Sequence, residues 1–201
     1  KKQKKKHVKV QKRAQAGTSI SLRPKHIDNR EEFGNWEMDT VVGAQKESKN
    51  TLLVLTERKT REEIVRKMKD KSATSVVKVL DSLERKLGTN LFRKVFKTIT
   101  VDNGTEFSDV KGIEKSKRSR KKRTKLFFCH PYRSCERGSN ENNNRLIRRH
   151  IPKGFNFDSM ARTEIQYIEN WINNYPRKIF GFRSAKELFL EELEKLGLAG
   201  S

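Results

Sequence analysis

The first third of the chain carries the residue patterns of β-strands. Two β-rich runs, Asn35–Gly43 and Asn50–Thr56, are separated by the polar segment Gln45–Lys49, which predicts a β-hairpin. A third short run around Ile64 and Val65 would extend the hairpin into a meander. We therefore expect an antiparallel start to a sheet.

The middle of the chain alternates between helical and strand patterns. Ser72 opens a helical period, and Gly88 stands where a C-terminal cap belongs. The apolar positions of this helix recur at helical spacing at Ala73, Val76, Val77, Leu80, Leu83 and Leu87. The β-branched run Lys97–Asp102 and the apolar run Leu126–Cys129 then predict two further strands.

The last third is helical. One helix begins near Gly138 and ends at Pro152, and a second follows Asp158. Ser184 and Glu187 have the spacing of a capping box that starts a third helix. The whole pattern predicts an α/β fold: a mixed sheet, with an antiparallel hairpin or meander followed by α/β alternation, and helices on its faces.

Charge changes this picture because it is concentrated in two segments. The 201 residues hold 47 Lys and Arg against 25 Asp and Glu, a formal net charge of +22, and 36% of them are charged. Residues 1–30 contain eleven basic residues and one acid, and Lys115–Lys125 contains eight and none. The rest has the composition of an ordinary domain, so we expect one domain with polycationic attachments.

Polycations at this density bind polyanions, which makes nucleic acid the first partner to consider and a membrane surface the second. A solvated tail is the plain alternative for the first thirty residues. No apolar run approaches the length of a membrane span, and no signal-peptide pattern follows the N-terminal lysines. Cys129 and Cys135, with four scattered histidines, indicate neither a zinc site nor a disulfide framework.

Two acids occupy unexpected places in this pattern. Asp39 interrupts a run that otherwise predicts a buried strand, and Asp102 ends the strand that begins at Lys97. A carboxylate there is costly unless a positive charge compensates it. Strand-end capping or pairing with Lys and Arg is the alternative explanation, since Asp-Asn-Gly is also a common turn sequence.

A third acid, Glu141, lies in the first turn of the helix that begins near Gly138. One turn and two turns later the same face carries cationic and amide side chains, at Asn144, Arg145, Arg148 and Arg149. A carboxylate beside a phosphate-binding track is consistent with a divalent cation between them. Magnesium prefers oxygen ligands, and two such ions about 4 Å apart serve phosphoryl transfer.

Three segments resemble the catalytic core of bacterial transposases of the insertion-sequence-30 family. They are W-E-M-D-T-V-V-G at Trp36–Gly43, T-V-D-N-G-T-E-F at Thr100–Phe107, and the long block from His130 to Gly154. The match in order and context runs from about Arg30 to Leu190. The resemblance implies a ribonuclease-H-like fold with residues 1–30 as a polybasic, disordered arm, 31–190 as the catalytic core with a basic insertion at 114–125, and 191–201 as a C-terminal helix end and tail.

The resemblance also implies a site and a chemistry. Asp39, Asp102 and Glu141 would be the catalytic and metal-binding DDE triad, holding two Mg²⁺ or Mn²⁺ ions, for cleavage at transposon ends and strand transfer into target DNA. The partner would be double-stranded DNA, bound by a homo-oligomer, with a dimer expected, in the bacterial cytoplasm near the nucleoid. DNA contacts are expected from Asn140, Asn144, Arg145, Arg148, Arg149, Lys153, Lys121, Lys122 and Arg123.

Some features leave alternatives open. Glu136 competes with Glu141 for the third position, whereas Glu37 and Glu106 are second candidates that strand alternation argues against. The spacer of thirty-eight residues before Glu141 is longer than is typical of the family, and Cys135 stands where relatives often have Trp.

Two other functions remain possible from the sequence. The helix-turn-helix that such transposases carry upstream is absent from the sequence, so a noncatalytic DNA-binding remnant is the second hypothesis. A tyrosine recombinase that uses Tyr132 or Tyr175 is the third, and it would leave Asp39 and Asp102 unexplained.

Overall fold

The structure, a computed structural model, describes residues 17–44, 47–131 and 138–197, and for 138–143 it describes the helical backbone only. Within these residues one mixed sheet has the strand order β1-β6-β5-β2-β3-β4. Its strands are β1 (Thr18–Ser19), β2 (Asn35–Val42), β3 (Thr51–Glu57), β4 (Glu63–Met68), β5 (Thr98–Val101) and β6 (Lys125–Phe128).

The sheet has two halves of different strand direction. β2, β3 and β4 form an antiparallel meander, and β5 then pairs parallel with β2, followed by β6 and β1 in parallel. The predicted hairpin and its third strand are therefore confirmed. The predicted strands that end near Asp102 and Cys129 are also confirmed, as β5 and β6.

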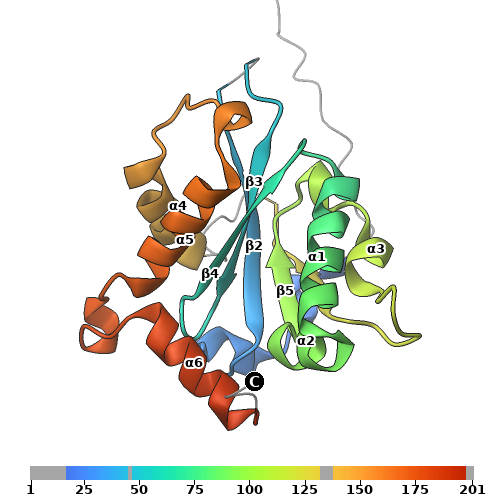
Figure 1. The fold of residues 1–201 in the computed structure, drawn as a ribbon. Coiled ribbons are helices and arrows are strands. Elements are labelled where there is room, and N and C mark those ends of the chain that lie inside the picture. Colours follow the sequence, from blue (N-terminus) through green and yellow to red (C-terminus); the bar gives the residue numbers. More distant parts are fainter. Residues whose placement is uncertain (1–16, 45–46, 132–137, 198–201) are drawn as a thin grey trace, which may run out of the picture.

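Helices cover both faces of the sheet, as expected (Figure 1). They are α1 (Ala73–Leu87), α2 (Thr89–Val95), α3 (Val110–Glu114), α4 (Gly138–His150), α5 (Arg162–Asn174) and α6 (Ala185–Lys195), together with short 3-10 turns. A first hydrophobic cluster lies between the sheet and α1, α2 and α3, around Trp36, Phe92 and Phe107. A second cluster lies between the sheet and α4 and α5, around Ile147, Phe157 and Ile172.

Local signals set the ends of the helices. The side chain of Ser72 accepts a hydrogen bond from the N–H of Ser75 and starts α1, while Gly88, at φ 77°, ends it. The capping box of Ser184 and Glu187 starts α6 as predicted. Trp36 is fully buried, whereas Trp171 is partly buried and packs against the second cluster.

The prediction that residues 1–30 form a separate arm is wrong for residues 17–30. Thr18 pairs with Phe127 at the sheet edge, Ile27 is buried, and buried Arg23 donates a hydrogen bond to Thr100 over 2.8 Å. Apolar and hydrogen-bonding residues within this basic stretch therefore attach it to the sheet. Residues 1–16 lie outside the described residues.

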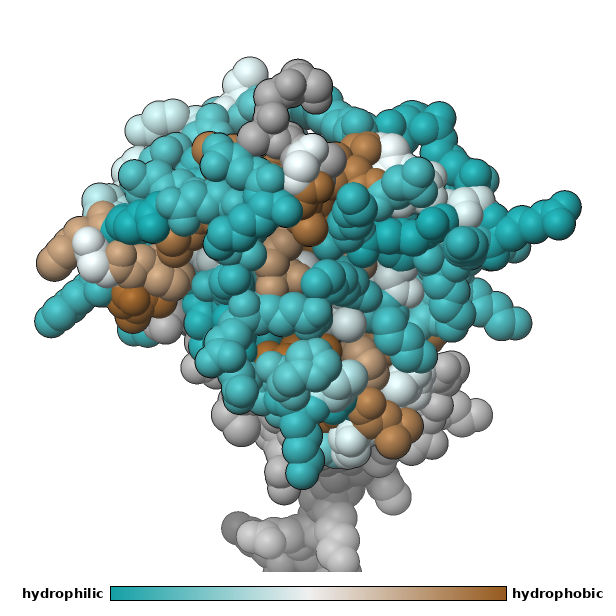
Figure 2. Space-filling view, turned by 90° about the horizontal axis from the view of Figure 1, so that it is seen from below, coloured by the Kyte–Doolittle hydropathy of each residue, from teal (hydrophilic) through white to brown (hydrophobic). Residues whose placement is uncertain are grey.

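The core also extends beyond the predicted boundary at residue 190. Leu193 and Leu196, at the end of α6, pack against the first cluster. No helix in the described residues is long and apolar enough to span a membrane. Seen from below, hydrophilic side chains cover most of the surface, and hydrophobic side chains form small separate patches (Figure 2).

Candidate active site

The sheet brings Asp39 and Asp102 level with each other. β2 and β5 pair in parallel with Asn35 opposite Thr98 and Glu37 opposite Thr100. Asp39 and Asp102 each lie two residues beyond this last pair. Because side chains two residues apart share a face of a strand, both acids lie on the face that α4 covers. Both are partly buried.

Asp39 is held by contacts from its own strand and from α4. The N–H of Thr40 donates to Asp39 Oδ1 over 2.8 Å, and Asn144 Nδ2 donates to Asp39 Oδ2 over 3.2 Å. Three residues after Asn144, about one helical turn, Ile147 is fully buried in the second cluster. The hydrophobic packing of α4 therefore positions the side chain of Asn144 next to the carboxylate of Asp39.

Asp102 lies in a turn that is braced from two sides. Its Oδ1 accepts a hydrogen bond from the N–H of Gly104 over 2.9 Å, an arrangement that suits Asp at the start of a turn. Asn103 Nδ2 donates to the carbonyl of Cys129 at the end of β6 over 2.9 Å. The Asp-Asn-Gly sequence thus forms a turn and also anchors that turn to the neighbouring strand.

The third predicted acid, Glu141, lies on α4, and its side chain is outside the described residues, as is that of Asn140. Asn144 follows Glu141 by three residues, and residues at this spacing lie on the same side of a helix. The Cα of Glu141 is therefore on the side of α4 from which Asn144 contacts Asp39. Tyr132, Cys135 and Glu136 lie outside the described residues.

Sequence reasoning undervalued Glu106. This residue is 2% exposed, and its Oε1 accepts a hydrogen bond from Thr40 Oγ1 over 2.6 Å and lies 3.2 Å from Lys71 Nζ. Strand alternation does not apply to it, since it lies in the 3-10 turn Thr105–Phe107. Its nearness to Asp39 depends on that turn, and the sequence signal available was the acid two residues after Asn-Gly.

The argument from strand alternation does not apply to Glu37. Being two residues before Asp39, it shares the face of that residue. It is fully buried and accepts a hydrogen bond from Arg58, which is itself buried. Burial lowers the pKa of Arg58, and the charge of Glu37 opposes that shift. Glu37 is therefore the partner of a buried arginine.

The basic residues of α4 and its following turn differ in accessibility. Arg145, Arg149 and Lys153 are exposed, and the guanidinium of Arg149 lies 5.9 Å from the ring centre of Tyr175. Arg148 is partly buried and donates to the carbonyls of Val42 and Pro152 over 3.2 and 3.4 Å. Burial lowers its pKa. Arg148 therefore helps to hold α4 against the end of β2.

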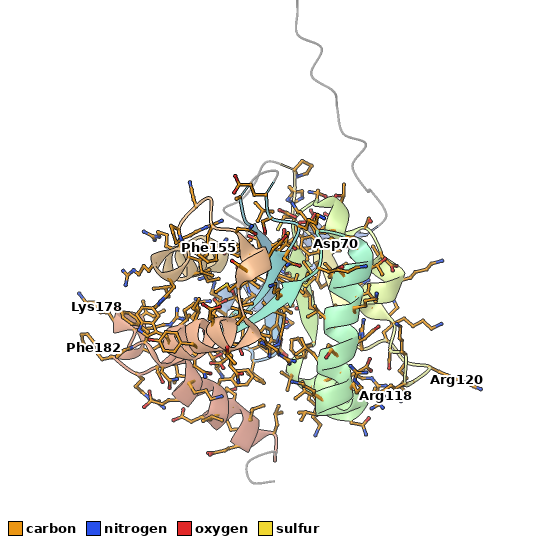
Figure 3. The ribbon with its side chains drawn as sticks, turned by 45° about the horizontal axis from the view of Figure 1, so that its top comes forward. Asp70, Arg118, Arg120, Phe155, Lys178 and Phe182 are labelled. Carbon is orange, nitrogen blue, oxygen red and sulfur yellow. The ribbon has the colours of Figure 1, made fainter. Side chains whose placement is uncertain are left out.

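The basic segment 114–125 is not a free loop. The segment packs on the second half of α1. There Arg123 Nη1 forms ion pairs with Asp81, over 2.7 Å, and with Glu84, over 3.2 Å. Figure 3 shows Arg118 and Arg120 projecting from this flank, away from the end of the molecule where Asp70 lies. Lys121 and Lys122 are exposed, with Lys122 Nζ 2.5 Å from Glu114 Oε2.

The prediction that Arg123 contacts DNA is wrong. Its side chain is 1% exposed, and it also donates to the carbonyls of Ile113 and Gly112 over 2.8 Å each. Its guanidinium nitrogens Nε, Nη1 and Nη2 all donate hydrogen bonds within the protein. A run of basic residues does not show which member is buried, because burial here depends on the two acids of α1.

Carboxylates at the strand ends suit a hard divalent cation. A Cβ built on Gly104 would lie 2.6 Å from Glu106 Oε2 and 2.9 Å from Asp102 Oδ1. Two carboxylates this close favour a cation between or beside them. Among the described side chains, to which that of Glu141 does not belong, no group of three His, Cys, Asp or Glu is arranged to hold a metal.

The fold of the chain is similar to that of a solved catalytic core. The structure is similar to the catalytic core domain of BIV integrase, with a TM-score of 0.57 and 16% identity over 82% of this chain and 98% of that one. The chain therefore has the ribonuclease-H-like fold of an integrase catalytic core, as predicted. No family model matches the chain.

Sequence relatives narrow this class. The chain is 37% identical over 180 residues to the transposase of IS4351 from Bacteroides fragilis, which covers 90% of this chain and 52% of that protein. It is 38% identical over 174 residues to a probable transposase of IS1161 from Streptococcus salivarius, covering 86% and 46%. Against the IS30C transposase InsI of Escherichia coli it is 33% identical over 178 residues, covering 86% and 42%.

The chain is thus a homologue of the insertion-sequence transposases of the IS30 kind, which confirms the resemblance seen in its motifs. It spans about half the length of these relatives. The similarity to each relative extends over at least 86% of this chain. Because β2, β5 and α4 lie well inside the chain, they fall within the similar region.

Proposed function

We propose that this chain is the catalytic core of a DNA transposase, which cleaves strands at transposon ends and transfers the freed 3′-hydroxyl into target DNA. The observation that carries the proposal is the parallel register of β2 and β5, whose last pair, Glu37 and Thr100, lies two residues before Asp39 and Asp102 on their respective strands, in a chain homologous to transposases. The contact from Asn144 to Asp39 supports a place for α4, and hence for Glu141, beside them.

In this proposal Asp39, Asp102 and Glu141 hold two Mg²⁺ or Mn²⁺ ions. When bound, such ions activate the attacking oxygen and stabilise the leaving oxygen of an in-line displacement at phosphorus. The protein contributes fixed ligands: Thr40 and Asn144 orient the carboxylate of Asp39, and Gly104 orients that of Asp102. Ligands that are held in place before the metal arrives bind it more tightly.

Double-stranded DNA is the proposed partner, both transposon ends and target. The exposed residues Arg145, Arg149 and Lys153 would neutralise phosphates next to the site, with Asn140 and Asn144 nearer the acids. Lys121 and Lys122 lie on the α1 flank and would add sequence-independent affinity. Pairing of two transposon ends calls for a homo-oligomer, and we propose a dimer that acts in the bacterial cytoplasm at the nucleoid.

The test is cleavage of an oligonucleotide that carries a transposon end, in the presence of Mg²⁺ or Mn²⁺. Asp39→Asn, Asp102→Asn and Glu141→Gln should each abolish cleavage and strand transfer while DNA binding persists. Two matched acid-to-amide variants serve as controls and should retain activity: Glu136→Gln, which tests the competing glutamate, and Glu194→Gln, an exposed residue of α6.

Other results would favour the remaining hypotheses. Salt-sensitive DNA binding without cleavage by the full-length protein would support a noncatalytic DNA-binding remnant. A covalent 3′-phosphotyrosine intermediate that forms without metal would support a tyrosine recombinase. Loss of activity in Glu136→Gln but not in Glu141→Gln would reassign the third acid.

A further inference from the structure

The hydrogen-bonded pairing of β2 and β5 ends before it reaches Asp39 and Asp102. The last paired residues are Glu37 and Thr100, and Asp39 and Asp102 lie two residues further along, about 7 Å beyond them. Neighbouring strands also rotate by about 20° relative to each other, so they diverge after their last pair. The ladder therefore does not by itself set the distance between the two carboxylates.

A side-chain contact bridges the two strand ends from the opposite face of the sheet. Successive side chains of a strand alternate, so Thr40 points away from the face that carries Asp39. Its hydroxyl donates to Glu106 Oε1 over 2.6 Å, and its N–H donates to Asp39 Oδ1 over 2.8 Å. Thr40 thus connects the carboxylate of Asp39 to Glu106.

Glu106 in turn is fixed relative to Asp102. Glu106 Oε2 and Asp102 Oδ1 both lie beside Gly104. A Cβ built on Gly104 would be 2.6 Å from Glu106 Oε2 and 2.9 Å from Asp102 Oδ1. The next residue, Phe107, is fully buried in the first cluster and anchors the 3-10 turn. Glu106 is therefore tied to the turn that carries Asp102 and, through Thr40, to the strand that carries Asp39.

The two oxygens of Glu106 have different surroundings. Thr40 and Lys71 both contact Oε1, whereas Oε2 is buried and has no hydrogen-bond partner among the described residues. A buried carboxylate is costly, and a bond to Thr40 alone requires only a neutral acceptor such as glutamine. Lys71 compensates the charge of Glu106 at Oε1, whereas the buried Oε2, on the side of Asp102, is left without a hydrogen-bond donor among the described residues.

We propose that Glu106 is a positioning residue of this active site. Through Thr40 and the Asp102 turn it sets the separation of Asp39 and Asp102 at a value that suits divalent ions. The inference rests on the proposed function, because that function supplies the ions. It concerns a residue outside the predicted triad, and it predicts effects on metal affinity that a residue needed only for folding would not produce.

The experiment measures Mn²⁺ binding to the full chain without DNA, by titration with electron paramagnetic resonance detection. Thr40→Val keeps the shape of the side chain and removes its hydroxyl, and Glu106→Ala removes the carboxylate. Each should weaken Mn²⁺ binding about tenfold or more, the usual effect of losing a group that supports a metal ligand. Thr40→Ser should restore the affinity, and Glu106→Gln should weaken it less than Glu106→Ala.

The exposed Thr105 of the same turn provides the control, and Thr105→Val should leave Mn²⁺ affinity unchanged. Thermal unfolding identifies the variants that remain folded. If folded Thr40→Val and Glu106→Ala bind Mn²⁺ as the wild type does, the inference is overturned while metal-dependent cleavage still stands. If the wild type binds no Mn²⁺ and cleaves no DNA, the proposed function itself fails.

Discussion

The amide of Asn144 in α4 donates a hydrogen bond to the carboxylate of Asp39 in β2, across 105 residues of sequence. This contact joins the helix that carries Glu141 to the strand that carries the first acid. Its geometry follows from packing, since Ile147 of the same helix and Ile151, directly after the helix, are buried in the second cluster. The position of α4 on the sheet therefore controls the site.

Replacing Asn144 tests this relationship. Asn144→Ala should lower the free energy of unfolding by about 1 kcal/mol, the usual net value of such a hydrogen bond, and should increase amide hydrogen exchange in α4. Urea unfolding and hydrogen-exchange mass spectrometry measure the two effects. Asn174→Ala is the matched control, because Asn174 is exposed and its amide donates to the carbonyl of Asn170 within α5. Equal effects of both variants would contradict the assignment.

Gly104 is expected to tolerate no side chain, although its backbone permits one. Its φ of −64° and ψ of 144° are accessible to any residue. A Cβ there would meet Glu106 Oε2 at 2.6 Å and Asp102 Oδ1 at 2.9 Å. Gly104→Ala should therefore displace the acids and reduce Mn²⁺ affinity and cleavage at least tenfold, whereas Thr105→Ala should have little effect. Unchanged affinity in Gly104→Ala would show that the turn adapts freely.

Arg123 is expected to contribute to stability. Arg123→Met would leave Asp81 and Glu84 without their buried partner, and should lower the free energy of unfolding by about 3 kcal/mol or more. Lys121→Met, at an exposed position two residues earlier, should change it by less than about 0.5 kcal/mol. Denaturant titration compares the two. A stable Arg123→Met protein with weakened DNA binding would restore the original prediction for this residue.

Glu62 should make stability depend on pH. Burial raises its pKa from 4.5 to about 7, against the opposing effect of Lys186. The folded state then keeps a proton that the unfolded state releases above pH 4.5. The free energy of unfolding should therefore fall as pH rises from about 4.5 to 7 and level off above that, a loss on the order of 2–3 kcal/mol.

Glu62→Gln separates this effect from those of other acids. The variant should be more stable than the wild type at pH 8, and the difference should disappear near pH 4. Glu194→Gln, at an exposed position, should follow the wild-type curve. Burial also raises the pKa of Glu57 and Glu63, so some pH dependence of the same sign remains in Glu62→Gln. Identical curves for Glu62→Gln and wild type would contradict the assignment.

The sequence alone determined strands β2 to β6 and helices α1, α4, α5 and α6, but not β1, α2 or α3, and it singled out Asp39 and Asp102. Strand patterns, the Ser72 and Ser184 caps and Gly88 report local preferences, and local preferences act over a few residues. Asp39 and Asp102 were recognised because an acid at a strand position is anomalous within a window of that size.

Tertiary structure decided what depends on contacts between distant segments. Arg123 is buried because Glu84 lies thirty-nine residues before it on a neighbouring helix, and Glu106 reaches Thr40 across sixty-six residues. Thr18 and Ser19 join the sheet as β1 because β6 offers them an edge. None of these outcomes is encoded in a local period, since burial and charge pairing are properties of the packed chain.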